Sequence, residues 1–100
     1  MRYNKLVRDK IPEIIRQKGG TPVTHVADMD EYRAKLFEKL REEVGEFLKE
    51  PSEIELVDIL EIVYALGKLL GIPPEELEAL RAKRVEERGA FREKIILEEA

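Results

Sequence analysis

The stretch that decides the fold is residues 54–70, IELVDILEIVYALGKLL, in which twelve of the seventeen residues are apolar. A helix that is apolar on nearly every side must be covered on nearly every side. Ser52 is followed three residues later by Glu55, a capping-box spacing, which predicts that this helix begins near residue 53. Because a chain of 100 residues has few other helices to cover it, the pattern favours a bundle completed by oligomerisation.

Three further helices are predicted around this one. Residues 31–49 follow a 3.6-residue apolar period after a capping aspartate, Asp28 or Asp30. Residues 7–18 and 75–88 have the same period. Each segment has a proline near or just before its start and is followed by a glycine that ends the helix. The short break at residues 50–52 predicts an antiparallel hairpin of the two central helices.

The predicted fold class is therefore all-α, an antiparallel bundle of about four helices that forms a single domain over residues 1–100. Residues 23–26 and 94–97 are β-prone, and they could pair as a short two-stranded ribbon.

Composition excludes several classes of protein. Lys and Arg number 18 against 22 Asp and Glu, a net charge of −4, which lacks the basic excess of proteins that bind polymeric nucleic acid. The absence of cysteine excludes disulfides, thiolate zinc sites and cysteine nucleophiles, and it fits a reducing cytoplasm. No apolar run approaches the ~18 residues of a membrane span, and no signal peptide is recognisable. The 40% of charged residues and the scarcity of amides are similar to thermophile compositions.

Acidic pairs recur on the two central helices. Glu43 and Glu46 are three residues apart on one helix, and Glu55 and Asp58 repeat that spacing on the next. Because the hairpin turn lies between the pairs, the four carboxylates could converge. Two such groups ~4 Å apart repel by about 4 kcal/mol at an effective dielectric constant of 20, which a divalent cation would relieve.

Oxygen ligands suit Mg²⁺ or Mn²⁺, and Mg²⁺ typically shares its coordination with substrate phosphates. A phosphoanhydride substrate is therefore expected. A di-iron bundle would need a Glu-x-x-His motif, and the only histidine, His25, lies outside both helices. The alternative is that the glutamates form a solvated helix face and that Glu55 serves only the capping box.

The acidic residues resemble the EExxE and ExxD signature of the all-α nucleoside triphosphate pyrophosphohydrolases, which include MazG-like proteins and phosphoribosyl-ATP pyrophosphohydrolase. Glu42, Glu43 and Glu46 match the first motif, and Glu55 and Asp58 match the second. Residues 3–12, YNKLVRDKIP, and 88–91, RGAF, are similar to one phosphoribosyl-ATP-pyrophosphohydrolase-like branch. Only eight residues separate Glu46 from Glu55, fewer than the family usually has.

The resemblance implies a Mg²⁺-dependent hydrolase that cleaves between the α- and β-phosphates and releases a nucleoside monophosphate and pyrophosphate, as in nucleotide-pool house-cleaning. It implies that Mg²⁺, or Mn²⁺ in its place, is bound by Glu43, Glu46, Glu55 and Asp58. Catalysis would involve Glu43 and Glu42, the latter as support for the ligands or as a base. Six cations are candidates for binding the substrate phosphates: Lys5, Arg8, Lys10, Lys83, Arg84 and Arg88.

Two alternatives remain. One is the phosphoribosyl-ATP reaction of histidine biosynthesis, and the other is a noncatalytic helical interaction module with a solvated acidic strip. The apolar central helix predicts a homodimer or homotetramer in either case. The base and sugar of a nucleotide substrate and the number of metal ions are left open by the sequence.

Overall fold

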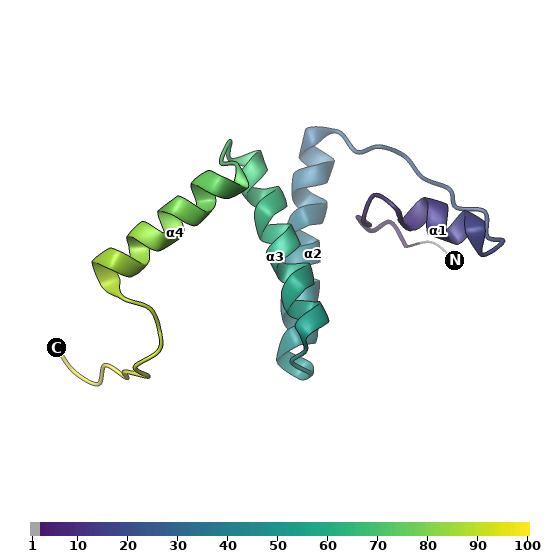
Figure 1. Cartoon of the computed structure of the whole chain (residues 1–100). Coiled ribbons are helices and arrows are strands. Elements are labelled where there is room, and N and C mark those ends of the chain that lie inside the picture. Colours follow the sequence, from purple (N-terminus) through teal and green to yellow (C-terminus); the bar gives the residue numbers. More distant parts are fainter. Residues whose placement is uncertain (1–2) are drawn as a thin grey trace. The chain divides into compact units, whose positions relative to one another are not determined.

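The computed structural model describes residues 3–100, and its regular structure there is entirely helical (Figure 1). The helices are α1 (Ile11–Gln17), α2 (Met29–Lys49), α3 (Glu53–Leu69) and α4 (Pro74–Arg88). The predicted all-α class is confirmed. None of these helices is both long enough and apolar enough to cross a membrane.

The two central helices begin and end where local side-chain chemistry predicts. Asp28 caps α2, because its carboxylate accepts a hydrogen bond from the backbone N–H of Glu31 at 2.8 Å. Ser52 caps α3 in the same way, its hydroxyl oxygen lying 3.2 Å from the backbone nitrogen of Glu55. Between them, residues 50–52 reverse the chain, so that α2 and α3 run antiparallel as a hairpin (Figure 1).

The first helix is shorter than the sequence predicts. We expected a helix over residues 7–18, but α1 begins at Ile11, and residues 7 and 8 lie in a loop before a turn at Asp9 and Lys10. Pro12 explains the difference, because it has no N–H to donate to the carbonyl of Arg8. The helix ends near the expected place, because Gly19 takes a φ of 89°, a conformation that suits glycine.

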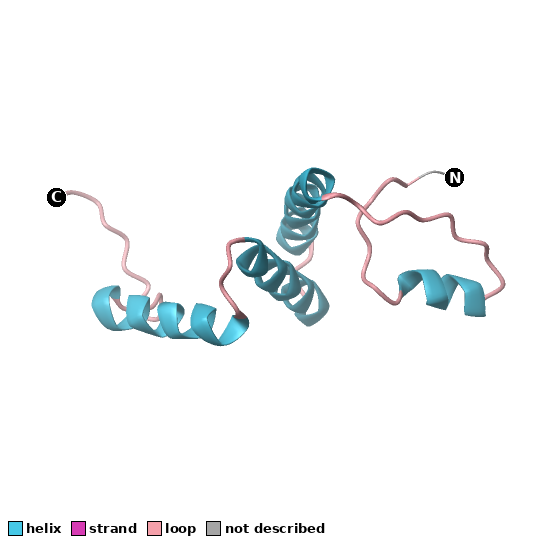
Figure 2. Ribbon diagram, turned by 90° about the horizontal axis from the view of Figure 1, so that it is seen from above, coloured by secondary structure: helices cyan, strands magenta, loops and turns pink. Residues whose placement is uncertain are grey.

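The predicted β ribbon is wrong. Residues 23–26 and 94–97 are loops, and no strand occurs in the described part of the chain (Figure 2). Val23 and Val26 are 96% and 98% exposed, and Ile95 to Leu97 are also exposed. A two-stranded ribbon without an apolar face packed on other elements is marginal in water, so β propensity alone does not form it.

The described residues fall into two compact units, one ending at Leu66 and the other comprising Gly67–Ala100. The first contains α1, α2 and most of α3, and its core includes Leu36, which is 2% exposed, and Ile62, which is 7% exposed. The second contains α4, which is followed by Gly89 as its C-cap residue, with a φ of 83°. The assignment of residues 1–100 to a single functional domain stays a prediction.

Much of the apolar surface of α3 is uncovered within the first unit. Leu56, Val57 and Leu60 are 51%, 59% and 48% exposed, although they belong to the stretch that the sequence marks for burial. Val63 and Tyr64 extend this exposed face along the helix. The expectation that one chain has too few helices to cover α3, and with it the number of chains in the assembly, stays a prediction.

Candidate metal centre

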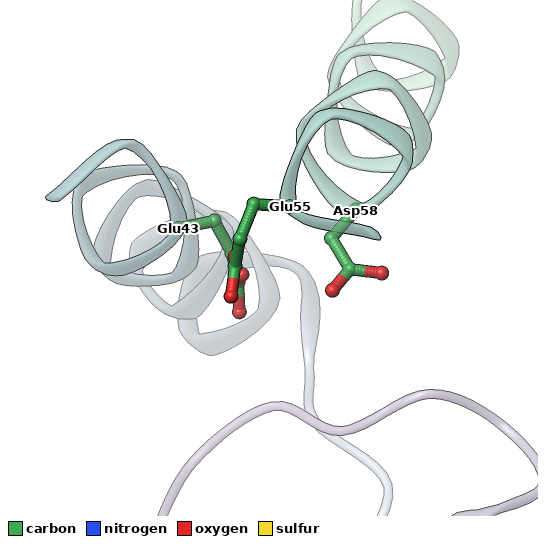
Figure 3. A group of neighbouring side chains, drawn as sticks. All are labelled: Glu43, Glu55 and Asp58. Atoms are coloured by element: carbon green, nitrogen blue, oxygen red, sulfur yellow. The ribbon is translucent and has the colours of Figure 1, made fainter. Parts of the chain in front are cut away.

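Three carboxylates converge across the α2–α3 hairpin. Glu43 of α2 and Glu55 and Asp58 of α3 each offer an oxygen, and these oxygens all lie within 4.8 Å of one another. Figure 3 shows the Glu43 and Glu55 carboxylates meeting between the two helices, with Asp58 turned to the same side. Of the four carboxylates predicted to converge, these three do so.

Glu55 takes part in both of the features predicted for it, the helix cap and the acidic cluster. Its backbone N–H is capped by Ser52, so one half of the capping box is present. Its carboxyl group, however, lies beside those of Glu43 and Asp58 in the acidic cluster. Glu55 therefore contributes its backbone to the helix cap and its carboxyl group to the acidic cluster.

The acidic cluster raises the pKa of Glu55 toward neutrality. The hydrogen bond with Glu43 is the largest cause that raises the pKa of Glu55, from 4.5 to about 7. Removal from water and the negative charges of Glu43, Asp58 and Glu46 raise this pKa further. Two carboxylates this close are most stable when they share one proton, and a cation would take the place of that proton.

The residues fit a hard divalent cation. The donors are carboxylate oxygens, which Mg²⁺ and Mn²⁺ prefer. The Oε2 atom of Glu55 is buried and has no hydrogen-bond partner among residues 3–100, although buried polar atoms are usually satisfied. The Glu43 side chain is only 13% exposed, so one ligand is already held inside the hairpin.

Glu46 and Glu42 lie outside this three-residue cluster. Glu46 is exposed and acts on the cluster through its charge, which raises the pKa of Glu55. The Glu42 carboxylate is paired with Lys5 at 3.3 Å and with Lys39 at 4.0 Å. The predicted metal role of Glu46 and the predicted catalytic role of Glu42 stay predictions.

Two cations lie directly against the cluster. The Arg8 guanidinium is 2.7 Å from an Asp58 oxygen, which joins the N-terminal segment to α3. Lys39 Nζ lies 3.7 Å from Glu43, one helical turn away on α2. Our sequence analysis missed Lys39, although its spacing of four residues before Glu43 is the signal of a helical ion pair.

Besides Lys5 and Arg8, one predicted phosphate-binding cation belongs to the first unit and three belong to the second. Lys10 is an exposed residue just before α1. Lys83, Arg84 and Arg88 are exposed on α4 in the second unit, and Lys83 Nζ lies 4.0 Å from Glu87. Their role toward a substrate stays a prediction.

A pocket of about 500 Å³ adjoins the carboxylates in the first unit. It lies between residues 6–11 and the two central helices, and its lining includes Glu43 and Asp58. The buried side chains of Leu36 and Ile62 form part of its wall, and Tyr32 supplies an aromatic ring. No local sequence pattern predicts this pocket, because it depends on how the N-terminal segment packs on the hairpin.

Comparison with known proteins yields one partial relative and no family assignment. A stretch of 42 residues, 42% of this chain, is 57% identical to a protein of Mycolicibacterium smegmatis (strain ATCC 700084 / mc(2)155) described only as uncharacterized. The matching stretch covers 43% of that protein, less than half of its length. The sequence matches no family profile, and no solved structure matches the chain.

Proposed function

We propose that this protein is a Mg²⁺-dependent pyrophosphohydrolase that cleaves nucleoside triphosphates between the α- and β-phosphates. The products would be a nucleoside monophosphate and pyrophosphate, and the role would be removal of unwanted nucleotides from the pool. The observation that carries the proposal is the convergence of Glu43, Glu55 and Asp58 within 4.8 Å across a hairpin. The resemblance of residues 42–58 to the EExxE and ExxD motifs supports it.

Each residue of the cluster has a distinct part in this proposal. Glu43, Glu55 and Asp58 would hold Mg²⁺, with Mn²⁺ as the alternative ion. When bound, the ion would neutralise phosphate charge and lower the pKa of an attacking water. Because the pKa of Glu55 is raised to about 7, its carboxyl group can release a proton near neutral pH.

Lys39 and Arg8 position the acidic groups and compensate their charge. Lys39 lies between Glu42 and Glu43, at 4.0 Å and 3.7 Å, and restrains both carboxylates. This contact supports the positioning role of Glu42 over its role as a base. Arg8 neutralises Asp58 and lies where it could turn to a substrate phosphate.

A screen for pyrophosphate release tests the proposal. Ribo- and deoxyribonucleoside triphosphates, their modified forms and phosphoribosyl-ATP are incubated with Mg²⁺, and the wild type is compared with Asp58→Asn and with Glu98→Gln as the exposed control. We expect release by the wild type and by Glu98→Gln, and none by Asp58→Asn. Equal rates for the wild type and Asp58→Asn would contradict the proposed site, and no release from any compound would favour a noncatalytic interaction module.

We also propose that a second copy of the chain covers α3. The uncovered face formed by Leu56, Val57, Leu60 and Val63 is apolar, and a monomer gains stability by burying it. A homodimer is the simplest assembly, and a homotetramer would bury more. The net charge of −4 argues against polymeric nucleic acid as a partner, and the lack of cysteine suits a reducing cytoplasm.

A further inference from the structure

The pocket beside the carboxylates has the size and walls of a site for a small organic group. Its volume is about 500 Å³, within the range of about 300 to 1,000 Å³ that small-molecule sites occupy. It adjoins the acidic cluster and shares two of its three residues, Glu43 and Asp58. Because these two residues are part of its lining, a ligand in the pocket would lie beside the carboxylates.

The walls suit a flat aromatic ring. Leu36 and Ile62 are buried and contribute aliphatic surface from the two facing helices. Val7 contributes from the N-terminal segment, and Ala65 leaves space because its side chain is small. Tyr32 adds an aromatic face, which favours stacking with a planar ring.

The uncompensated charges of the lining favour hydrogen-bond donors. Arg8 and Lys39 are paired with Asp58 and Glu43, so these four charges compensate one another. Asp9 and Glu61 also line the pocket, and neither has an ion-pair or hydrogen-bond partner among residues 3–100. Ionised carboxylates are acceptors only, and they match the exocyclic amino group of a base.

We propose that this pocket binds the base of the nucleotide and that Asp9 and Glu61 select bases with an exocyclic amino group. Cytosine and adenine would be preferred over their keto counterparts, uracil and hypoxanthine. The proposal rests on the proposed function, because the phosphates would then lie beside Glu43 and Asp58. The N-terminal segment would determine specificity as the wall that carries Asp9.

The first experiment measures kcat/KM with Mg²⁺ for the matched pairs CTP and UTP, and ATP and ITP. We expect the amino member of each pair to be favoured about tenfold, the size of one lost hydrogen bond to a charged group. The double variant Asp9→Ala/Glu61→Ala should bring both ratios close to one, whereas Glu98→Ala should keep them. A wild type without preference, or a preference that the double variant retains, overturns the selectivity.

The second experiment detects the pocket without catalysis. Cytidine, uridine, adenosine and inosine, which carry no phosphate, are titrated with chelator present, and backbone amide shifts are followed by NMR. We expect cytidine and adenosine to change the chemical shifts of the backbone amides of Tyr32, Leu36 and Ile62. The pocket-filling variant Ala65→Phe should abolish these changes. The backbone spectrum of that variant without ligand reports whether it is folded, and Ala65→Val is the milder substitute if it is not.

The two experiments separate the pocket from the proposed function. Chemical-shift changes of the pocket residues on nucleoside binding, with no hydrolysis of any triphosphate, would support the base site and contradict the proposed pyrophosphohydrolase activity. Hydrolysis that is equally fast in Ala65→Phe, with nucleoside shifts absent or confined to other residues, would overturn the base site and leave the proposed function standing.

Discussion

Divalent metal binding should depend steeply on pH, because the ligand Glu55 must lose a proton before it can coordinate a cation. Its pKa is raised to about 7 by the hydrogen bond with Glu43 and by the surrounding charge. Protons and metal therefore compete for the same carboxyl group. The perturbation is a change of pH from 8 to 5 at constant ionic strength, with Mn²⁺ as the probe.

The size of the effect follows from this pKa. With a pKa of about 7, Glu55 is about 90% ionised at pH 8, about 10% at pH 6 and about 1% at pH 5. If one proton leaves when the metal enters, the association constant falls about tenfold for each unit of pH below 7. Between pH 8 and pH 7 it should change only about twofold.

The assay is isothermal titration calorimetry with Mn²⁺ in two buffers of different ionisation enthalpy, which counts the protons released. About one proton should be released at pH 6 and almost none at pH 8. Glu55→Gln cannot be deprotonated, so it should bind weakly and release none. His25→Gln is the control, because the imidazole lies 2.9 Å from Glu31 and is an alternative metal ligand. An association constant that does not change between pH 5 and pH 7 would refute the reasoning.

The same proton should affect the stability of the metal-free protein. Between pH 4.5 and about 7 the folded state keeps a proton that the unfolded state has lost. The unfolded state then binds fewer protons, so the free energy of unfolding falls as the pH rises through this window and levels off above it. The difference between the wild type and Glu55→Gln in urea unfolding isolates this contribution. A difference that stays constant from pH 4.5 to 7 would show that Glu55 is not protonated in the folded state.

Four further predictions follow from particular contacts. Asp58→Asn should abolish pyrophosphate release, while urea unfolding without metal changes by no more than about 1 kcal/mol, because its partner Arg8 is exposed; a large loss of stability would make Asp58 a structural residue. Ser52→Ala should lower the free energy of unfolding by ~1 kcal/mol through the lost cap of α3 and leave turnover per folded molecule unchanged; reduced turnover would connect the cap to catalysis. Arg8→Gln should tighten Mn²⁺ binding by about two- to fivefold, since a competing cation is removed, and should raise KM for the triphosphate; weaker Mn²⁺ binding would contradict this competition. Light scattering at micromolar concentration should give at least twice the chain mass of 11.6 kDa, and Leu60→Glu should reduce it to the monomer; a wild-type monomer would refute the α3 interface.

The helices are predictable from sequence where short-range signals decide them. Asp28, Ser52 and the prolines and glycines at the helix ends fix boundaries within one or two residues for α2, α3 and α4. The start of α1 was misplaced because the apolar period continues through Val7, whereas the missing N–H of Pro12 prevents the helical bond there. The ribbon of residues 23–26 with 94–97 failed because strand pairing depends on distant partners that propensity does not encode.

The part of the candidate site that depends on helical spacing was predictable from the sequence. Glu43, Glu55 and Asp58 could be placed together because a short turn joins two helices whose acidic pairs have the same spacing. The contact of Arg8 with Asp58 spans 50 positions of the sequence, so no local pattern could reveal it. The pocket wall formed by Leu36 and Ile62 likewise depends on tertiary packing.

Phosphorus NMR of a nucleoside triphosphate incubated with the protein and Mg²⁺ in ¹⁸O-labelled water tests the central claim most directly. We expect resonances of a nucleoside monophosphate and pyrophosphate, formed together and at equal rates, and we expect neither with Asp58→Asn or with chelator. The ¹⁸O label should appear in the monophosphate if water attacks the α-phosphate. A nucleoside diphosphate with inorganic phosphate, or an unchanged triphosphate with every base tested, would contradict the account.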